Sequence, residues 1–116
     1  MARAEDNIQR TVVHWIRATC PGVVVFHVPN GGRRSRAEAA IFKGLGVLAG
    51  VPDLIILWPG RCAGLELKAP GGRPTPAQLA IGEQMQSLGH LWGWADSVDD
   101  AIGLLKSWGV PTRETS

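Results

Sequence analysis

DLIILWPGRCAGLELK, residues 53–68, is the stretch that predicts the centre of the fold. Its first half, from Leu54 to Leu57, is an apolar run typical of inner strands that are buried on both faces. Pro59-Gly60 is a turn signal. The second half alternates apolar and charged residues in Gly64-Leu65-Glu66-Leu67-Lys68. The stretch therefore predicts a β-hairpin that carries charges in an apolar setting.

The register of this hairpin decides which charged residues face one another. If Trp58 pairs with Arg61 across a two-residue loop, Asp53 lies directly opposite Glu66. A loop two residues longer places Asp53 opposite Lys68 instead. In both cases Glu66 and Lys68 share one face of their strand, because side chains alternate between faces with a period of two.

Asp53 and Glu66 form a candidate metal site. Cross-strand neighbours have Cβ atoms about 5 Å apart, and two carboxylates at that distance repel each other and lose hydration beside an apolar sheet. Mg²⁺ or Mn²⁺ removes the repulsion, because these hard cations prefer oxygen ligands. The alternative is a solvated strand face with a weak salt bridge. The apolar runs around the charges favour the metal site.

The rest of the chain alternates between helix and strand patterns. Before the hairpin, we expect a helix over 3–19, a strand over 23–28 and a helix from about Ser35 toward Leu45, with a capping box at its start. After it, we expect a helix from Thr75 to Leu88, a strand over 91–95 and a helix from Ser97 to about 109. The order αβαββαβα predicts an α/β fold with a mixed sheet flanked by helices.

Length and composition predict a single domain over residues 1–116, with a frayed tail from about residue 110. No apolar run approaches the ~20 residues needed to cross a bilayer, and the N-terminal residues are polar, unlike a signal peptide. We therefore expect no membrane association and a cytoplasmic location. Cys20 and Cys62 lack the spacing of a zinc site or disulfide framework, so we expect small buried thiols.

The net charge of +2 says little about partners, but the distribution of arginines says more. Arg33, Arg34 and Arg36 follow the loop Asn30-Gly31-Gly32, and Arg73 flanks the acidic hairpin. Such a cluster is commonly a solvated surface. Beside a glycine-rich loop and a carboxylate site, a role in binding a phosphate backbone is the better interpretation.

These segments in this order resemble the virus-type replication-repair nuclease (VRR-NUC) domain of the PD-(D/E)xK nuclease superfamily. The resemblance runs from Glu5 to about Ile102. It rests on Glu5 with Gln9, residues 29–32, 50–54 and 66–68, and Gly72-Arg73 leading to residues 75–78. It implies a restriction-endonuclease-like core and a metal-dependent hydrolase of DNA, often branched DNA such as a Holliday junction. The tryptophan-rich final third has no counterpart in these motifs.

Phosphodiester hydrolysis needs an activated water and stabilisation of charge on the phosphoryl oxygens, and Mg²⁺ or Mn²⁺ can supply both. We assign metal ligation to Asp53 and Glu66. Lys68, on the same face as Glu66, is expected to orient the water or stabilise the developing negative charge. The resemblance adds the backbone carbonyl of Leu67 as a further metal ligand.

The resemblance also implies roles outside the hairpin. Glu5 corresponds to a helix-borne acid that holds a metal-bound water, although an acid at a helix N-terminus is equally explained by the macrodipole. Gln78 is either a hydrogen-bonding residue of the site or an ordinary exposed helix residue. Asn30 and Gly31 join the arginines as the expected nucleic-acid-binding residues.

Residues that would indicate functions of other classes are few in this sequence. His14, His27 and His90 lack metal-type spacing and are more typical of structural histidines, with His27 the best placed of the three because it precedes the glycine-rich loop. No phosphate-binding P-loop motif occurs in the sequence. A non-catalytic nucleic-acid-binding module would have no need for all of the hairpin charges. An RNA substrate stays open, since recognition of the 2′-OH depends on loop geometry.

The chain is also expected to form a homodimer. One small domain offers one active site, whereas cutting both strands or a symmetric junction takes two, and oligomers are usually symmetric dimers. An apolar patch that includes one or more of Trp92, Trp94 and Trp108 is the expected interface. The alternative is that these tryptophans are core or isolated surface residues.

Overall fold

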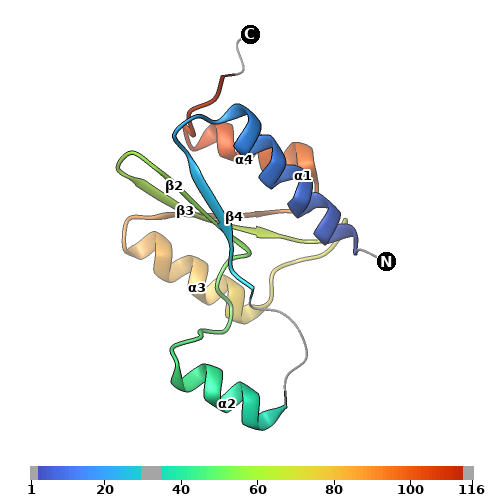
Figure 1. Cartoon of the computed structure of the whole chain (residues 1–116), viewed down its shortest axis with the longest axis vertical. Helices are drawn as coiled ribbons and strands as arrows, with labels where there is room; N and C mark the ends of the chain where they lie inside the picture. The colour runs from blue at the N-terminus through green and yellow to red at the C-terminus, as the bar shows by residue number, and fades with distance from the viewer. Residues whose placement is uncertain (1–2, 30–34, 114–116) are drawn as a thin grey trace.

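The computed structural model describes residues 3–29 and 35–113. Eight elements follow one another in the order expected from the sequence (Figure 1). They are α1 (Ala4–Thr19), β1 (Val24–His27), α2 (Arg36–Gly44), β2 (Leu54–Trp58), β3 (Arg61–Leu67), α3 (Pro76–Ser87), β4 (Leu91–Ala95) and α4 (Val98–Ser107). Their bounds differ from the expected ones mainly in the strands: β1 is shorter, and β3 already begins at Arg61.

The four strands form one mixed sheet in the order β1-β2-β3-β4. The β1–β2 and β2–β3 pairs are antiparallel, and β4 runs parallel to β3. The prediction of an α/β fold with a mixed sheet flanked by helices is therefore confirmed.

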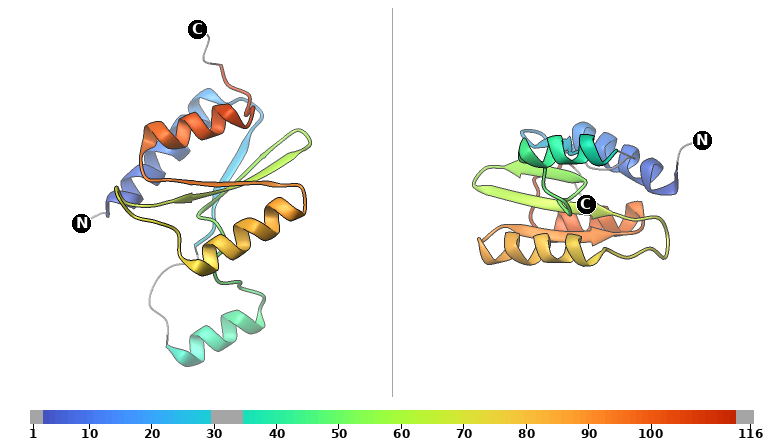
Figure 2. Two further views of the ribbon diagram at one scale, coloured as in Figure 1. Left: turned by 180° about the vertical axis from the view of Figure 1, so that it is seen from behind. Right: turned by 90° about the horizontal axis from the view of Figure 1, so that it is seen from below.

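The core lies between the sheet and the helices α1 and α4. Helix α1 buries Ile8, Val12 and Ile16, a four-residue spacing that places them on one face. They join Leu54 and Leu65, both fully buried, in one apolar cluster. Figures 1 and 2 show α1 and α4 side by side, with α3 on the opposite side of the sheet.

Helix α2 stands apart from this core, at the bottom of Figure 1. It begins with the expected capping box, in which the Glu38 N–H donates to Ser35 Oγ and the Ser35 N–H donates to Glu38 Oε1. None of its residues is buried, and Ile41 is 62% exposed. Local capping therefore starts this helix, although none of its side chains is buried among residues 3–29 and 35–113.

The end of the chain and one cysteine differ from expectation. Residues 110–113 are not frayed: Val110 is buried, and the Arg113 N–H donates to the Thr19 carbonyl at 2.7 Å, which ties the segment to α1. Cys20 is buried as expected, but Cys62 is half-buried, and both are free thiols. Within the described ranges, no helix combines the length and apolarity needed to span a bilayer.

Candidate active site

The hairpin adopts the shorter of the two predicted loops. Trp58 pairs with Arg61 across Pro59-Gly60, and the ladder continues to Leu54 opposite Leu65. The next position along this register is Asp53 opposite Glu66. The register with a longer loop, which would set Asp53 opposite Lys68, is wrong.

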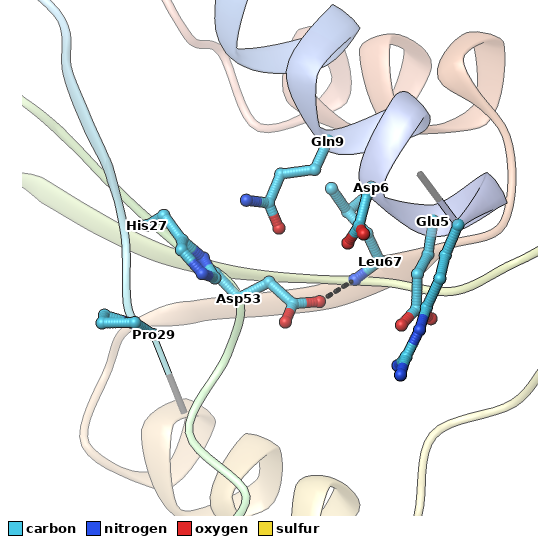
Figure 3. Close-up of a pocket in the computed structure, with 8 residues that line it drawn as sticks. Glu5, Asp6, Gln9, His27, Pro29, Asp53 and Leu67 are labelled. Carbon is cyan, nitrogen blue, oxygen red and sulfur yellow. Dashed lines mark hydrogen bonds between the residues drawn. The ribbon is translucent and has the colours of Figure 1, made fainter. Parts of the chain in front are cut away.

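Asp53 is held at both its backbone and its side chain. The Leu67 N–H donates to Asp53 Oδ2 at 2.8 Å (Figure 3). The Asp53 carbonyl accepts the Val28 N–H at 2.9 Å and lies 2.8 Å from Nδ1 of His27. A carbonyl can only accept, so Nδ1 of His27 carries the proton in this contact. Strand β1 thus fixes the residue that bears the carboxylate.

Glu66 is the one charged or polar residue of the described chain that is classed as buried, with 1% of its surface exposed. Burial raises the pKa of this carboxyl to about 9, helped by the hydrogen bond that it shares with the Asp53 side chain and by the negative charge of Asp53. Its Oε2 is buried without a hydrogen-bond partner. An orphaned buried oxygen is costly, and it marks a position where a cation or another donor is expected.

Glu5 and Lys68 act on the same carboxyl. The negative charge of Glu5 contributes to the raised pKa of Glu66, whereas the positive charge of Lys68 opposes the shift. Helix α1 therefore brings Glu5 to the hairpin from a distant part of the sequence. The three acidic side chains and the lysine that were predicted as catalytic come together in one place.

Two hollows of about 410 and 400 Å³ meet at this place. They share Glu5, Asp53 and Leu67 in their walls, and Glu66 and Lys68 line the second. The remaining residues of the first hollow come from α1 and β1 and from the positions directly beside them: Arg3, Asp6, Gln9, His27 and Pro29. Those of the second come from the approach to β2 and the start of α3: Ala49, Gly50, Val51, Thr75, Ala77 and Gln78. The shared wall is the position where a substrate reaching both hollows would meet the carboxylates.

The donor set fits a divalent cation that keeps part of its shell open. Carboxylates of Asp53 and Glu66 are hard oxygen donors, and the orphaned Oε2 lacks a partner. The Leu67 carbonyl points to the same side as its N–H, toward Asp53, as in any strand residue. Within residues 3–29 and 35–113 there is no ready-made group of three acidic, histidine or cysteine ligands. Mg²⁺ needs none, because it typically binds one or two carboxylates with water and substrate oxygens.

Gln78 belongs to the wall of the second hollow and also to a helix cap. Its Oε1 accepts the Thr75 N–H at 2.8 Å, and its own N–H donates to Thr75 Oγ1 at 3.3 Å, which completes the capping box of α3. The N-terminus of α3 thus faces the site, where its dipole favours a negative group. The cap engages Oε1 and leaves the side-chain amide group as the donor for the site.

The predicted nucleic-acid-binding residues are only partly described. Asn30, Gly31, Arg33 and Arg34 lie outside the described residues. Arg36, at the start of α2, and Arg73, between β3 and α3, are exposed and line neither of the two hollows.

His27 is the residue that sequence reasoning undervalued. Its spacing predicts a structural histidine, yet its ring lines the first hollow and contacts the Asp53 carbonyl. Arg3 and Asp6 in the same wall were not singled out at all. The available signal was the position of His27 at the end of a strand before a glycine-rich loop.

The tryptophans of the final third are mostly packed within the chain. A Cβ at Gly82 would lie 2.4 Å from the ring of Trp92, and one at Gly93 would lie 3.0 Å from the ring of Trp108. These glycines therefore make room for the two rings. Trp94 is 37% exposed and pairs with Glu66 in the parallel ladder.

Comparisons with known proteins place this geometry among nucleases. No model of a protein family matches the chain. The chain is 32% identical over 96 residues to a protein of Acyrthosiphon pisum secondary endosymbiont phage 1 named "Putative nuclease p44", and the alignment covers 82% of this chain and 85% of that protein. A solved structure named "VRR_NUC domain protein" is 28% identical, with a TM-score of 0.75 over 96% of this chain and 93% of that one. Another, named "VRR_NUC domain", has a TM-score of 0.66 at 22% identity and covers 92% and 99% of the two chains, which supports the fold alone.

Proposed function

Because the chain belongs to the VRR-NUC family of nucleases, we propose that it is a metal-dependent endonuclease that hydrolyses phosphodiester bonds of DNA. The observation that carries this proposal is the Glu66 carboxyl. It is buried, has an orphaned oxygen and a raised pKa, and lies beside Asp53 where two polar hollows meet. An acid in that environment is costly to keep unless it binds a cation.

The residues of the site have separate tasks in this reaction. Asp53, Glu66 and the Leu67 carbonyl would hold Mg²⁺ or Mn²⁺, which when bound lowers the pKa of water and polarises the phosphoryl group. Lys68, in the wall of the second hollow, provides positive charge for the phosphoryl oxygens. Glu5 extends from α1 into both hollows and accepts a hydrogen bond from the attacking water.

We propose branched DNA as the preferred substrate. The two hollows lie on both sides of the carboxylates. They give room for two DNA arms that leave the site in different directions, as at a branch point. A non-catalytic binding module on the same fold is the competing function, and the presence of Asp53, Glu66 and Lys68 together in one hollow counts against it. RNA as a substrate is the other competing outcome. The cytoplasmic location stays a prediction from the sequence.

The decisive experiment is cleavage of end-labelled junction, flap, splayed-arm, linear duplex and single-stranded substrates, each as DNA and as RNA. Every substrate is incubated with Mg²⁺, with Mn²⁺ and with excess EDTA. Cleavage of DNA that requires either metal, and that is fastest on branched forms, is the expected result. Full activity in EDTA would rule out the metal-dependent mechanism, and cleavage of RNA alone would change the substrate class.

We also propose a homodimer, with its interface away from the packed rings of Trp92 and Trp108. Large exposed apolar side chains gather elsewhere. On β1 and β2, Val24 lies opposite Leu57 in the ladder, and both side chains are exposed. Phe26 on β1 is also 43% exposed, so one face of this half of the sheet presents apolar side chains. This half of the sheet and the apolar side of α2 are the better interface.

Light scattering tests the assembly at micromolar protein concentration. A mass of two chains is expected for the wild type, and a mass of one chain for Phe26→Asp. Trp94→Ser is the matched control, because Trp94 is exposed to a similar degree on another edge of the sheet. A monomer mass for the wild type, with and without DNA, excludes the dimer. If only Trp94→Ser loses the dimer, the interface contains Trp94 and not the exposed face of β1 and β2.

A further inference from the structure

A third hollow, with basic residues in its wall, continues the active site along α1. Its volume is about 370 Å³, and its walls are Gln9, Arg10, Val13, His14, Arg17 and His27. Gln9 and His27 also line the first hollow, where they approach from α1 and β1 (Figure 3). The first hollow in turn shares Asp53 with the second. The three hollows thus adjoin one another and make a continuous groove with the carboxylates between its ends.

The far part of this groove is basic. Among its described lining residues there is no acid, and Arg10, His14 and Arg17 all come from α1. Arg10 and Arg17 are exposed and seven residues apart, which is about 10.5 Å along a helix. Successive phosphates of one DNA strand rise by about 3.4 Å along the duplex axis. Two arginines at this separation can therefore contact two different phosphates of one strand.

The groove is also held in shape. Arg17 Nη2 donates to the Val25 carbonyl at 3.3 Å, which links α1 to β1 across the groove. Nδ1 of His27 donates to the Asp53 carbonyl, so its other ring nitrogen is left for a ligand in the groove. Gln9 lies in the wall of both hollows.

We propose that the groove between α1 and β1 binds the sugar–phosphate backbone of the DNA strand on one side of the scissile phosphate. Arg10 and Arg17 contact phosphates, and Gln9 and His27 contact the nucleotide that joins the groove to the active site. This binding arm rests on the proposed nuclease function, and it is separate from the arginines of the 33–36 segment. Lengthening the DNA strand on one side of the cleavage position should therefore raise its affinity, whereas lengthening it on the other side should not.

The first test measures DNA binding without cleavage. Fluorescence anisotropy with Ca²⁺ in place of Mg²⁺ gives the affinity of labelled DNA over a range of salt concentrations. Arg10→Gln should weaken binding about tenfold and reduce the slope of log affinity against log salt by roughly one. Arg61→Gln is the matched control, because Arg61 is exposed at the hairpin turn and lines none of the three hollows. Circular dichroism and thermal unfolding verify that both variants fold.

The second test locates the arm on the substrate. A series of DNA strands is extended by one nucleotide at a time, either 5′ or 3′ of the position where the wild type cuts. Extension on one side should raise affinity in steps for the wild type and Arg61→Gln, and the gain should disappear in Arg10→Gln. Equal binding by Arg10→Gln and the wild type, or a loss of the same size in Arg61→Gln, overturns the proposal.

Cleavage of a small phosphodiester separates this inference from the proposed function. Bis(p-nitrophenyl) phosphate fills the central site alone, so Arg10→Gln should hydrolyse it at the wild-type rate with Mn²⁺ while its KM for long DNA rises. If the arm binds DNA as described but neither protein hydrolyses any diester, the groove stands and the nuclease function fails. If both hydrolyse all substrates equally, the groove is overturned and the nuclease function stands.

Discussion

The β2–β3 hairpin and helix α2 are both predicted well from local sequence, yet they have opposite surroundings. The hairpin contributes to the core, where Leu54, Ile56 and Leu65 are fully buried, although Leu57 on its other face is 37% exposed. Helix α2 has no buried residue, and Leu45 beside it is 76% exposed. Turn and cap signals therefore predict that a helix or strand forms. Packing of the whole domain decides whether a charged side chain on it is buried and has a shifted pKa.

The largest expected effect is on catalysis at the hairpin. Lys68→Ala should lower the turnover of branched DNA by about 10²–10³, because a preorganised charge next to the reacting phosphoryl group is lost. DNA affinity should change much less, since the charge acts mainly in the transition state. Single-turnover cleavage and anisotropy measure the two quantities. Lys43→Ala on α2 is the matched control, and a near wild-type rate for Lys68→Ala would refute the assignment of the hairpin.

The next effect concerns the pH dependence of stability without metal. The pKa of Glu66 is raised from 4.5 to about 9 in the folded protein. Between these values the folded state retains a proton that the unfolded state has released, so its contribution to stability is full below about pH 4.5 and declines as the pH rises toward 9. Urea unfolding in EDTA across this range measures the decline.

Glu66→Gln sharpens this test, because glutamine resembles the protonated acid. The variant should lose this part of the pH dependence in EDTA, and it should lose both the stabilisation by Mn²⁺ and cleavage. Mn²⁺ binding to the wild type near pH 7 should release close to one proton, measured by calorimetry in buffers of different ionisation enthalpy. An unchanged pH profile in Glu66→Gln would contradict the raised pKa.

A smaller effect is expected from filling space beside a buried ring. Gly82→Ala places a methyl group 2.4 Å from Trp92 and should destabilise the protein by about 1–3 kcal/mol. Gly44→Ala, in the last position of α2, meets nothing within 4 Å and should change stability by less than about 1 kcal/mol. Equilibrium unfolding of both variants compares the packed and the exposed region directly. Equal effects would mean that α2 is as tightly packed as α3.

The smallest effect is expected on the exposed apolar side of α2. Ile41→Ser should change the unfolding free energy of the monomer by less than about 0.5 kcal/mol, because the side chain is already 62% exposed. Ile56→Ser places a hydroxyl group at a fully buried position, so it should lower the unfolding free energy far more than Ile41→Ser does. Thermal unfolding at low concentration measures this contrast. A large loss in Ile41→Ser at all concentrations would show that the helix is covered within its own chain.

The sequence by itself determined the elements and much of the chemistry. Pro59-Gly60 predicted the hairpin turn, Ser35 and Thr75 predicted helix caps, and strand alternation set Glu66 and Lys68 on one face. These signals act over a few residues, so they can be recognised without knowledge of the rest of the chain.

Tertiary structure alone decided the register, the burial and the neighbours. Local sequence left Asp53 with two possible partners, and only the packed sheet sets it opposite Glu66. The raised pKa of Glu66 arises first from burial and then from Asp53, with a smaller contribution from the charge of Glu5, more than fifty residues away in sequence. The contact of His27 with the Asp53 carbonyl joins strands that are distant in the chain. Desolvation and cross-strand hydrogen bonds depend on which distant segments meet, and that information is carried by the packing of the whole domain.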